Sequence, residues 1–172
     1  MTDDHRSEAT LTGTERQQLE AFLHDNRLEI VGLLGGVTEE QARRRLVPSL
    51  TTLLALVKHA TFVEKAWFHC SLAGRTRAEA GIPEDADASF VLTDEDTVAS
   101  VLAGYRQAWA EADEIAAAHD LDDLAVHNRR GPLTLRWIYV HMVEELARHA
   151  GHGDILRELI LTAPTDQPPA AP

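Results

Sequence analysis

The sequence predicts an all-α fold, a four-helix bundle with an up-down arrangement and long connections. Four long segments repeat apolar residues at the three- and four-residue spacings of an amphipathic helix. No segment shows the regular alternation of apolar and polar residues that predicts a half-buried strand. The length of 172 residues suits one domain that can bury a full core. We therefore expect one bundle domain over residues 14–161, between two looser ends.

The first helix is predicted to begin after Thr14 and to stop at Gly35-Gly36. Thr14 followed three residues later by Gln17 is a capping-box pattern, and glycine commonly terminates helices. The apolar side chains of this segment share one helical face: Leu19, Phe22, Leu23, Ile30, Leu33 and Leu34. Residues 1–13 are polar, so we expect a flexible N-terminus.

A second capping-box pattern, Thr38 with Gln41, predicts a short helical segment that ends near Pro48. The second long helix is expected over residues 50–73. The connection over residues 74–92 is rich in Gly, Pro, Ala and Asp and is the longest loop that we expect. Loops of this length inside compact domains often carry function.

The third helix is predicted to be capped by Thr93, because three acidic residues follow it in the first turn. Its apolar side chains form one stripe: Val98, Val101, Leu102, Tyr105, Trp109, Ala112 and Ile115. After a loop over residues 119–132, the fourth helix is expected over residues 133–161, with a bend near Gly151 and Gly153. Residues 162–172 carry four prolines and no large apolar residue, which predicts a disordered tail.

Charge and composition exclude several classes of protein. The chain has 28 acidic and 16 basic side chains, and the net charge of −12 argues against nucleic acid as a partner. A single cysteine, Cys70, excludes an internal disulfide and a cysteine-rich zinc module. The sequence shows neither an apolar run long enough to cross a membrane nor an N-terminal secretion signal, so we expect a cytoplasmic protein.

The last predicted helix carries a cluster of histidines, His141, His149 and His152, around Glu145. At about 100° per residue, Glu145 and His149 point into the apolar stripe, and the other two histidines lie at its edge. A buried glutamate and histidine are costly unless both are satisfied. A metal ion held between facing helices would satisfy both. The alternative is that Glu145 pairs with a protonated histidine or an arginine, and that the histidines are ordinary core residues.

A third metal ligand would have to come from another helix, and His59 is the best candidate. It shares a face of the second long helix with apolar residues, whereas both lysines of the chain fall on the opposite side. His69 borders the lysine side and ranks below it. Cys70 lies near the C-terminal end of this helix, where we interpret it as a small core residue rather than a nucleophile.

Two stretches carry a resemblance to a known family. Residues 135–158, LRWIYVHMVEELARHAGHGDILRE, closely resemble the last helix of a DinB-like family of small bacterial proteins, written approximately LRW…HMIEE.ARH.GHAD.LRE. Residues 54–68, LALVKHATFVEKAWF, resemble the second-helix motif of the family, L..LVKHL..VE..WF. The resemblance covers residues from about 14 to 161. It relates the chain to mycothiol S-transferases and mycothiol-dependent maleylpyruvate isomerases.

The resemblance implies a bundle, often dimeric, that holds a divalent metal through one residue of the second helix and two of the last. Carried over to this chain, the ligands are His59, Glu145 and His149. Relatives with three histidines have histidine in place of Glu145. They commonly read HRGQ from the final ligand onward, where this chain has His149-Ala-Gly-His152, so the role of His152 stays open. Zinc is the expected metal, with nickel, manganese and iron as alternatives.

The resemblance further implies an S-transferase in which a metal-bound thiolate of the mycothiol type attacks an electrophilic small molecule. The alternatives are a thiol-dependent isomerase, a non-catalytic metal-binding protein connected with stress, and a metal-free structural bundle. His141 and His152 are candidates for proton transfer, with structural hydrogen bonds as the alternative. Arg129, Arg130 and Arg136 are candidates for binding a carboxylate of the thiol cosubstrate, with solvated surface charges as the alternative.

Overall fold

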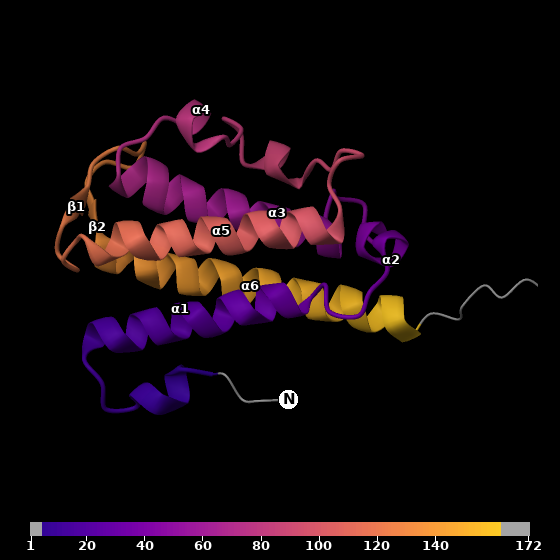
Figure 1. The fold of residues 1–172 in the computed structure, drawn as a ribbon, viewed down its shortest axis with the longest axis horizontal. Coiled ribbons are helices and arrows are strands. Elements are labelled where there is room, and N and C mark those ends of the chain that lie inside the picture. The colour runs from indigo at the N-terminus through magenta and orange to yellow at the C-terminus, as the bar shows by residue number, and fades with distance from the viewer. Residues whose placement is uncertain (1–4, 163–172) are drawn as a thin grey trace, which may run out of the picture.

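The structure is a computed structural model of the chain that describes residues 5–162. Its four long helices lie side by side as a bundle (Figure 1) and confirm the predicted fold class. They are α1 (Glu15–Gly32), α3 (Leu53–Glu64), α5 (Val98–Ala117) and α6 (Leu135–Thr162). A π-helix (Lys65–Leu72) continues α3 without a break. The predicted disordered tail lies outside the described residues, except for Thr162, which ends α6.

One long connection, between α3 and α5, sets the directions of the helices. Helices α1 and α6 run the same way and pack along each other, whereas α3 and α5 run the opposite way (Figure 1). The chain returns along the bundle between α3 and α5, through α4 (Arg77–Ala80) and a 3-10 helix (Asp87–Phe90). This connection contains more structure than the loop expected over residues 74–92.

Capping residues explain where the helices begin. Both predicted capping boxes are present, with Thr14 and Gln17 at the start of α1 and with Thr38 and Gln41 at the start of α2 (Glu39–Arg43). Helix α3 begins after Thr52, whose side chain accepts a hydrogen bond from the Ala55 backbone. Each cap satisfies backbone N–H groups that a helix end leaves unpaired.

The predicted start of the third long helix is wrong. Helix α5 begins at Val98, with Thr97 as its cap. Thr93 instead closes a separate turn, in which its backbone N–H and its hydroxyl donate to Asp96 at 2.6 and 3.0 Å. Thr93 and Thr97 lie four residues apart, and either could cap a helix. The contacts that Asp96 makes outside the turn favour Thr97 as the start of α5.

Three further short elements were not predicted. Strands β1 (Leu124–Ala125) and β2 (Leu133–Thr134) form one antiparallel pair that is too short for a periodic sequence pattern. The segment predicted to be a flexible N-terminus contains a 3-10 helix (Ser7–Thr10). Backbone N–H groups of Arg6 and Ser7 donate to the Asp25 carboxylate at 2.8 and 3.0 Å, which fixes this helix against α1.

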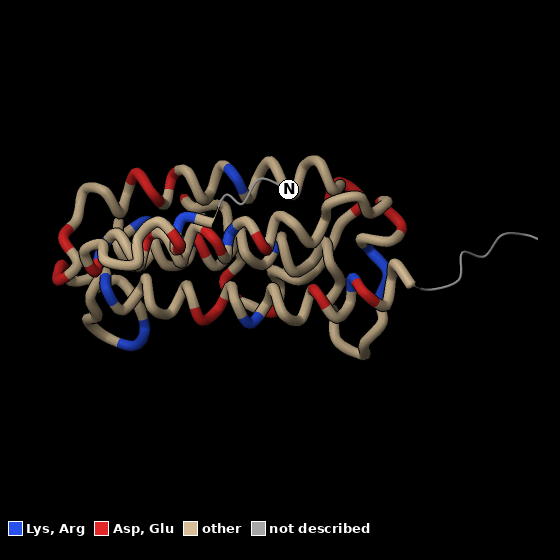
Figure 2. The backbone as a smooth tube through the Cα atoms, turned by 90° about the horizontal axis from the view of Figure 1, so that it is seen from below, with Lys and Arg blue, Asp and Glu red and all other residues tan. Residues whose placement is uncertain are grey.

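The core fills the space between the four helices, but the predicted face of α1 is only partly right. Leu23, Ile30 and Leu33 are buried as predicted. Phe22 was also predicted to be buried but is 52% exposed, whereas Arg27, a charged residue, is buried. Acidic and basic residues intermix along the bundle (Figure 2). Among the described residues, none of the helices combines the length and hydropathy needed to cross a bilayer.

Candidate metal centre

Three side chains from two helices converge at the centre of the bundle. His59 projects from α3, and Glu145 and His149 project one turn apart from α6. One potential ligand atom from each lies within 4.8 Å of the other two. Glu145 Oε1 is 3.5 Å from His59 Nε2 and 3.2 Å from His149 Nε2. The structure thus brings together the three residues that the sequence reading proposed as ligands, and we call them the His–Glu–His cluster.

The chemical states of the cluster suit a metal ligand set. Burial lowers the pKa of His59, which favours the neutral imidazole that coordinates metals. The hydrogen bond with His149 holds the pKa of the Glu145 carboxyl far below its usual range, so this group is a carboxylate. His149 Nδ1 is buried and has no hydrogen-bond partner among the described residues. Two imidazoles and one carboxylate with an unpaired nitrogen fit a divalent transition metal.

The outer side of His59 is covered by residues 87–96, a segment that we call the strap. The 3-10 helix in the strap places Ser89 Oγ 2.7 Å from His59 Nδ1. The Phe90 ring stacks on the imidazole, with centroids 4.1 Å apart and planes 18° apart. Neither residue was predicted from the sequence, because a single serine or phenylalanine in a long connection has no local pattern that indicates which helix it contacts.

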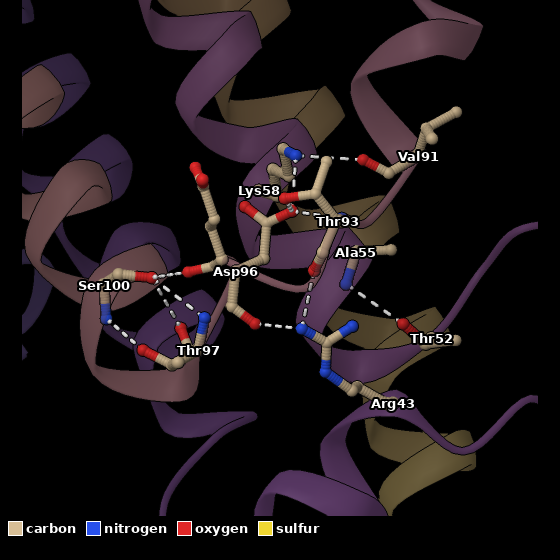
Figure 3. A network of polar contacts seen from close by, with 10 residues as sticks. Arg43, Thr52, Ala55, Lys58, Val91, Thr93, Asp96, Thr97 and Ser100 are labelled. Carbon is tan, nitrogen blue, oxygen red and sulfur yellow. Dashed lines mark hydrogen bonds and ion pairs between the residues drawn. The ribbon is translucent and has the colours of Figure 1, made fainter.

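A polar network fixes the strap beside the cluster (Figure 3). Lys58, the neighbour of His59 in sequence, donates to the Val91 carbonyl at 2.9 Å and to Asp96 at 2.8 Å. Arg43 of α2 donates to the carbonyls of Thr93 and Asp96. These bonds hold both the strap and the start of α5 against α3.

An open groove of about 810 Å³ lies between α3, α5 and the long connection. Phe62, Val91 and Val101 give it apolar walls, and Lys65 adds a cation. Ser89 belongs to both the groove and the contact with His59. The groove therefore adjoins the outer side of the cluster.

His141 lies on α6 one turn before Glu145, in an aromatic group that also contacts Arg130 of the preceding loop. The His141 ring stacks on Trp137 with centroids 5.0 Å apart and meets Trp67 edge-on at 4.8 Å. The Arg130 guanidinium lies over both indoles, at 5.3 and 5.9 Å from their centroids. Burial lowers the pKa of His141. His141 thus lies near the cluster but is not a member of it.

The remaining predicted residues lie in different surroundings. His152 is exposed, and its ring centroid is 5.8 Å from that of His149. Arg136 already pairs with two carboxylates, from α1 and from the loop before β1. Arg129 is exposed. The three arginines that were predicted to bind the cosubstrate therefore lie in different environments and do not form one binding site.

The comparisons with known proteins identify the family of the chain. No curated protein matches the chain. The model of the family described as Mycothiol-S-transferase matches residues 18–161, a range that contains all four long helices except the first three residues of α1 and the last of α6, and also the whole His–Glu–His cluster. The predicted resemblance is thereby confirmed: this chain belongs to the mycothiol S-transferase family, a DinB-like family.

Proposed function

We propose that this protein is a metal-dependent S-transferase that joins a small thiol of the mycothiol type to an electrophilic small molecule. The observation that carries the proposal is the convergence of His59, Glu145 and His149 within 4.8 Å, inside the range matched by the family. Family membership supports the thiol chemistry, and the donor set supports the metal. Zinc is our first choice of ion, ahead of nickel, manganese and iron.

In the proposed site, His59, Glu145 and His149 would hold the ion and leave a coordination position free, as catalytic zinc sites do. A divalent ion bound there lowers the pKa of a coordinated thiol. The residues of the chain would fix the position of the ion: Glu145 would supply negative charge, and Ser89 and Phe90 restrain His59.

The nucleophile in this proposal belongs to the cosubstrate. The only cysteine, Cys70, is buried in the π-helix, and burial raises its pKa, so it is a poor thiolate. In the transfer, the S–H bond of the thiol breaks and an S–C bond to the electrophile forms. The leaving group departs with its bonding electrons, and the thiol proton passes to it or to water. His152, exposed beside His149, would carry that proton.

Two further parts of the proposal concern the state of the protein. We propose that the protein acts in the cytoplasm. We also propose that it is a homodimer, because α6 exposes apolar side chains that a second copy could cover: Val140 at 55%, Ile155 at 62% and Leu159 at 52%. Their exposure supports an interface without identifying the partner face.

Metal analysis followed by product analysis tests the proposal. Protein purified without a histidine tag should hold about one divalent ion per chain, and His59→Ala or His149→Ala should lose it. Mycothiol and 1-chloro-2,4-dinitrobenzene should then give a thioether faster with the wild type than with either variant. Isomerisation of maleylpyruvate with the thiol recovered unchanged would identify the isomerase instead. Absence of binding for zinc, nickel, iron and manganese would refute the proposal.

A further inference from the structure

The strap contributes a buried hydroxyl to His59. Ser89 is only 2% exposed, and its Oγ lies 2.7 Å from His59 Nδ1. The same oxygen lies 2.5 Å from the carbonyl oxygen of Ala86. Ser89 is therefore held between one ring nitrogen and one backbone carbonyl, and its small exposure leaves little room for water to replace either partner.

The direction of these two bonds follows from their chemistry. A carbonyl oxygen can only accept, so the Ser89 hydroxyl donates its hydrogen to Ala86. The hydroxyl oxygen then accepts from His59 Nδ1, which must carry a hydrogen. A neutral imidazole carries only one such hydrogen, so Nε2 keeps a lone pair. That lone pair faces the Glu145 carboxylate across 3.5 Å.

A cation held between these two electron-rich atoms would attract both of them. Phe90 stacks on the imidazole and restricts how far its plane can tilt. Lys58 fixes the following part of the strap through Val91 and Asp96 (Figure 3). The ring of His59 is therefore held in both orientation and hydrogen position by the strap.

We propose that Ser89 is a positioning residue that holds His59 as the Nδ1–H tautomer and thereby directs the Nε2 lone pair toward a cation shared with Glu145 and His149. The part that concerns the cation rests on the proposed function. The tautomer itself is a property of the metal-free protein, and it can be tested without any metal or substrate.

The first test is the tautomer. Metal-free protein labelled with ¹⁵N-histidine is studied by long-range ¹H–¹⁵N correlation spectroscopy, with the His59 signals assigned from a His59→Gln spectrum. We expect the hydrogen on Nδ1 in the wild type and a mixture of tautomers in Ser89→Ala. A wild-type ring with its hydrogen on Nε2, or with hydrogens on both nitrogens, would overturn the proposal, even if Ser89→Ala failed to fold. An unchanged tautomer in folded Ser89→Ala would also overturn it.

The second test is zinc affinity, measured by competition with a chromophoric chelator. Loss of a group that orients a ligand typically weakens metal binding 10- to 100-fold, so we expect Ser89→Ala to bind zinc at least tenfold more weakly. Ser89→Thr keeps the hydroxyl and should restore most of the affinity. Ser71→Ala is the matched control, because it removes a buried hydroxyl that donates to the Ala66 carbonyl and, among the described residues, has no contact with His59. Equal losses in Ser71→Ala and Ser89→Ala would contradict a specific role for Ser89.

The two tests separate this inference from the proposed function. A wild type that binds none of zinc, nickel, iron and manganese but has His59 in the Nδ1–H form would refute the metal site and retain the positioning role of Ser89 on the ring. Zinc binding by a protein whose His59 carries its hydrogen on Nε2 would retain the metal site and refute the role of Ser89.

Discussion

Arg27 and Glu64 form a doubly hydrogen-bonded ion pair inside the bundle, with Nε to Oε1 and Nη2 to Oε2 both at 2.7 Å. The side chains are 2% and 0% exposed. The third bond of the guanidinium goes to Asp113 at 2.7 Å. Arg27 thus connects α1 with α3 through Glu64 and with α5 through Asp113. Glu64 lies about one and a half turns after His59 on α3.

Arg27→Met should lower the free energy of unfolding by about 3–5 kcal/mol, because it leaves the Glu64 charge buried without its partner. Adding Glu64→Leu should recover much of the loss, since an apolar pair of similar volume carries no charge to desolvate. Urea unfolding of the metal-free proteins measures both effects. A double variant less stable than Arg27→Met would show that the pair is not the source of the loss.

Gly153 of α6 packs directly against Leu33, the residue that caps the C-terminal end of α1. A Cβ added there would lie 2.4 Å from Leu33 Cδ1, and Leu33 is only 1% exposed and has little room to move. Gly153→Ala should therefore cost about 1–3 kcal/mol through overpacking. Gly151→Ala meets nothing within 4 Å and should stabilise α6 by up to about 1 kcal/mol. Thermal unfolding compares the two variants, and equal effects would contradict the close approach.

Local sequence signals predicted most of the fold. Capping boxes at Thr14 and Thr38 fixed two helix starts, and apolar periodicity located the four long helices. Glu145 and His149 could be placed together because residues four apart share a helix face. His59 was predicted to face them because its side of the helix is apolar. The structure places His59 next to Glu145 and His149.

The parts that could not be predicted depend on contacts between distant segments. The rule that charges stay outside fails for Arg27, because its partner Glu64 lies 37 positions away and each residue satisfies the other. The start of α5 depends on contacts of Asp96 with α3 and α2. Ser89 carries no local pattern, and only the length of its connection indicated a function.

His69 should make stability depend on pH. It is 1% exposed, and burial lowers its pKa below the ordinary value of 6.5, with Arg75 acting in the same direction. As pH falls, the unfolded chain takes up the proton first, so the stability present above about pH 6.5 decreases below it. The slope for one proton is at most about 1.4 kcal/mol per pH unit.

The measurement is urea unfolding between pH 7 and pH 5 with a chelator present, so that metal release does not contribute. His69→Gln should flatten the pH dependence, whereas His127→Gln, which removes an exposed ring, should leave the slope unchanged. A slope that is the same in the wild type and in His69→Gln would assign the pH dependence to other groups.

Breaking the ion pair of Lys58 with Asp96 should loosen the strap more than it destabilises the fold. The two side chains are 30% and 16% exposed, so the pair is worth about 1 kcal/mol or less. Lys58→Met should therefore weaken zinc binding roughly two- to fivefold through a less restrained Ser89. Asp96→Asn should act alike, and the double variant should add little. Effects that add fully would show that the two residues act separately.

Glu145→Gln tests the charge of the His–Glu–His cluster without a change of shape. The amide keeps the size of the side chain but removes the negative charge that faces His59 and His149. We expect at least tenfold weaker zinc binding in chelator competition, because an amide is a poorer ligand than a carboxylate for this ion.

The neighbouring residue supplies the control for this prediction. Glu144 is exposed and pairs with Arg148 on the outer face of α6, so Glu144→Gln removes the same charge from the same turn. Its zinc affinity should stay within about twofold of the wild type, since an exposed charge is screened by solvent. If both variants lost affinity equally, the effect would come from the overall charge of α6, and the assignment of Glu145 as a ligand would fail.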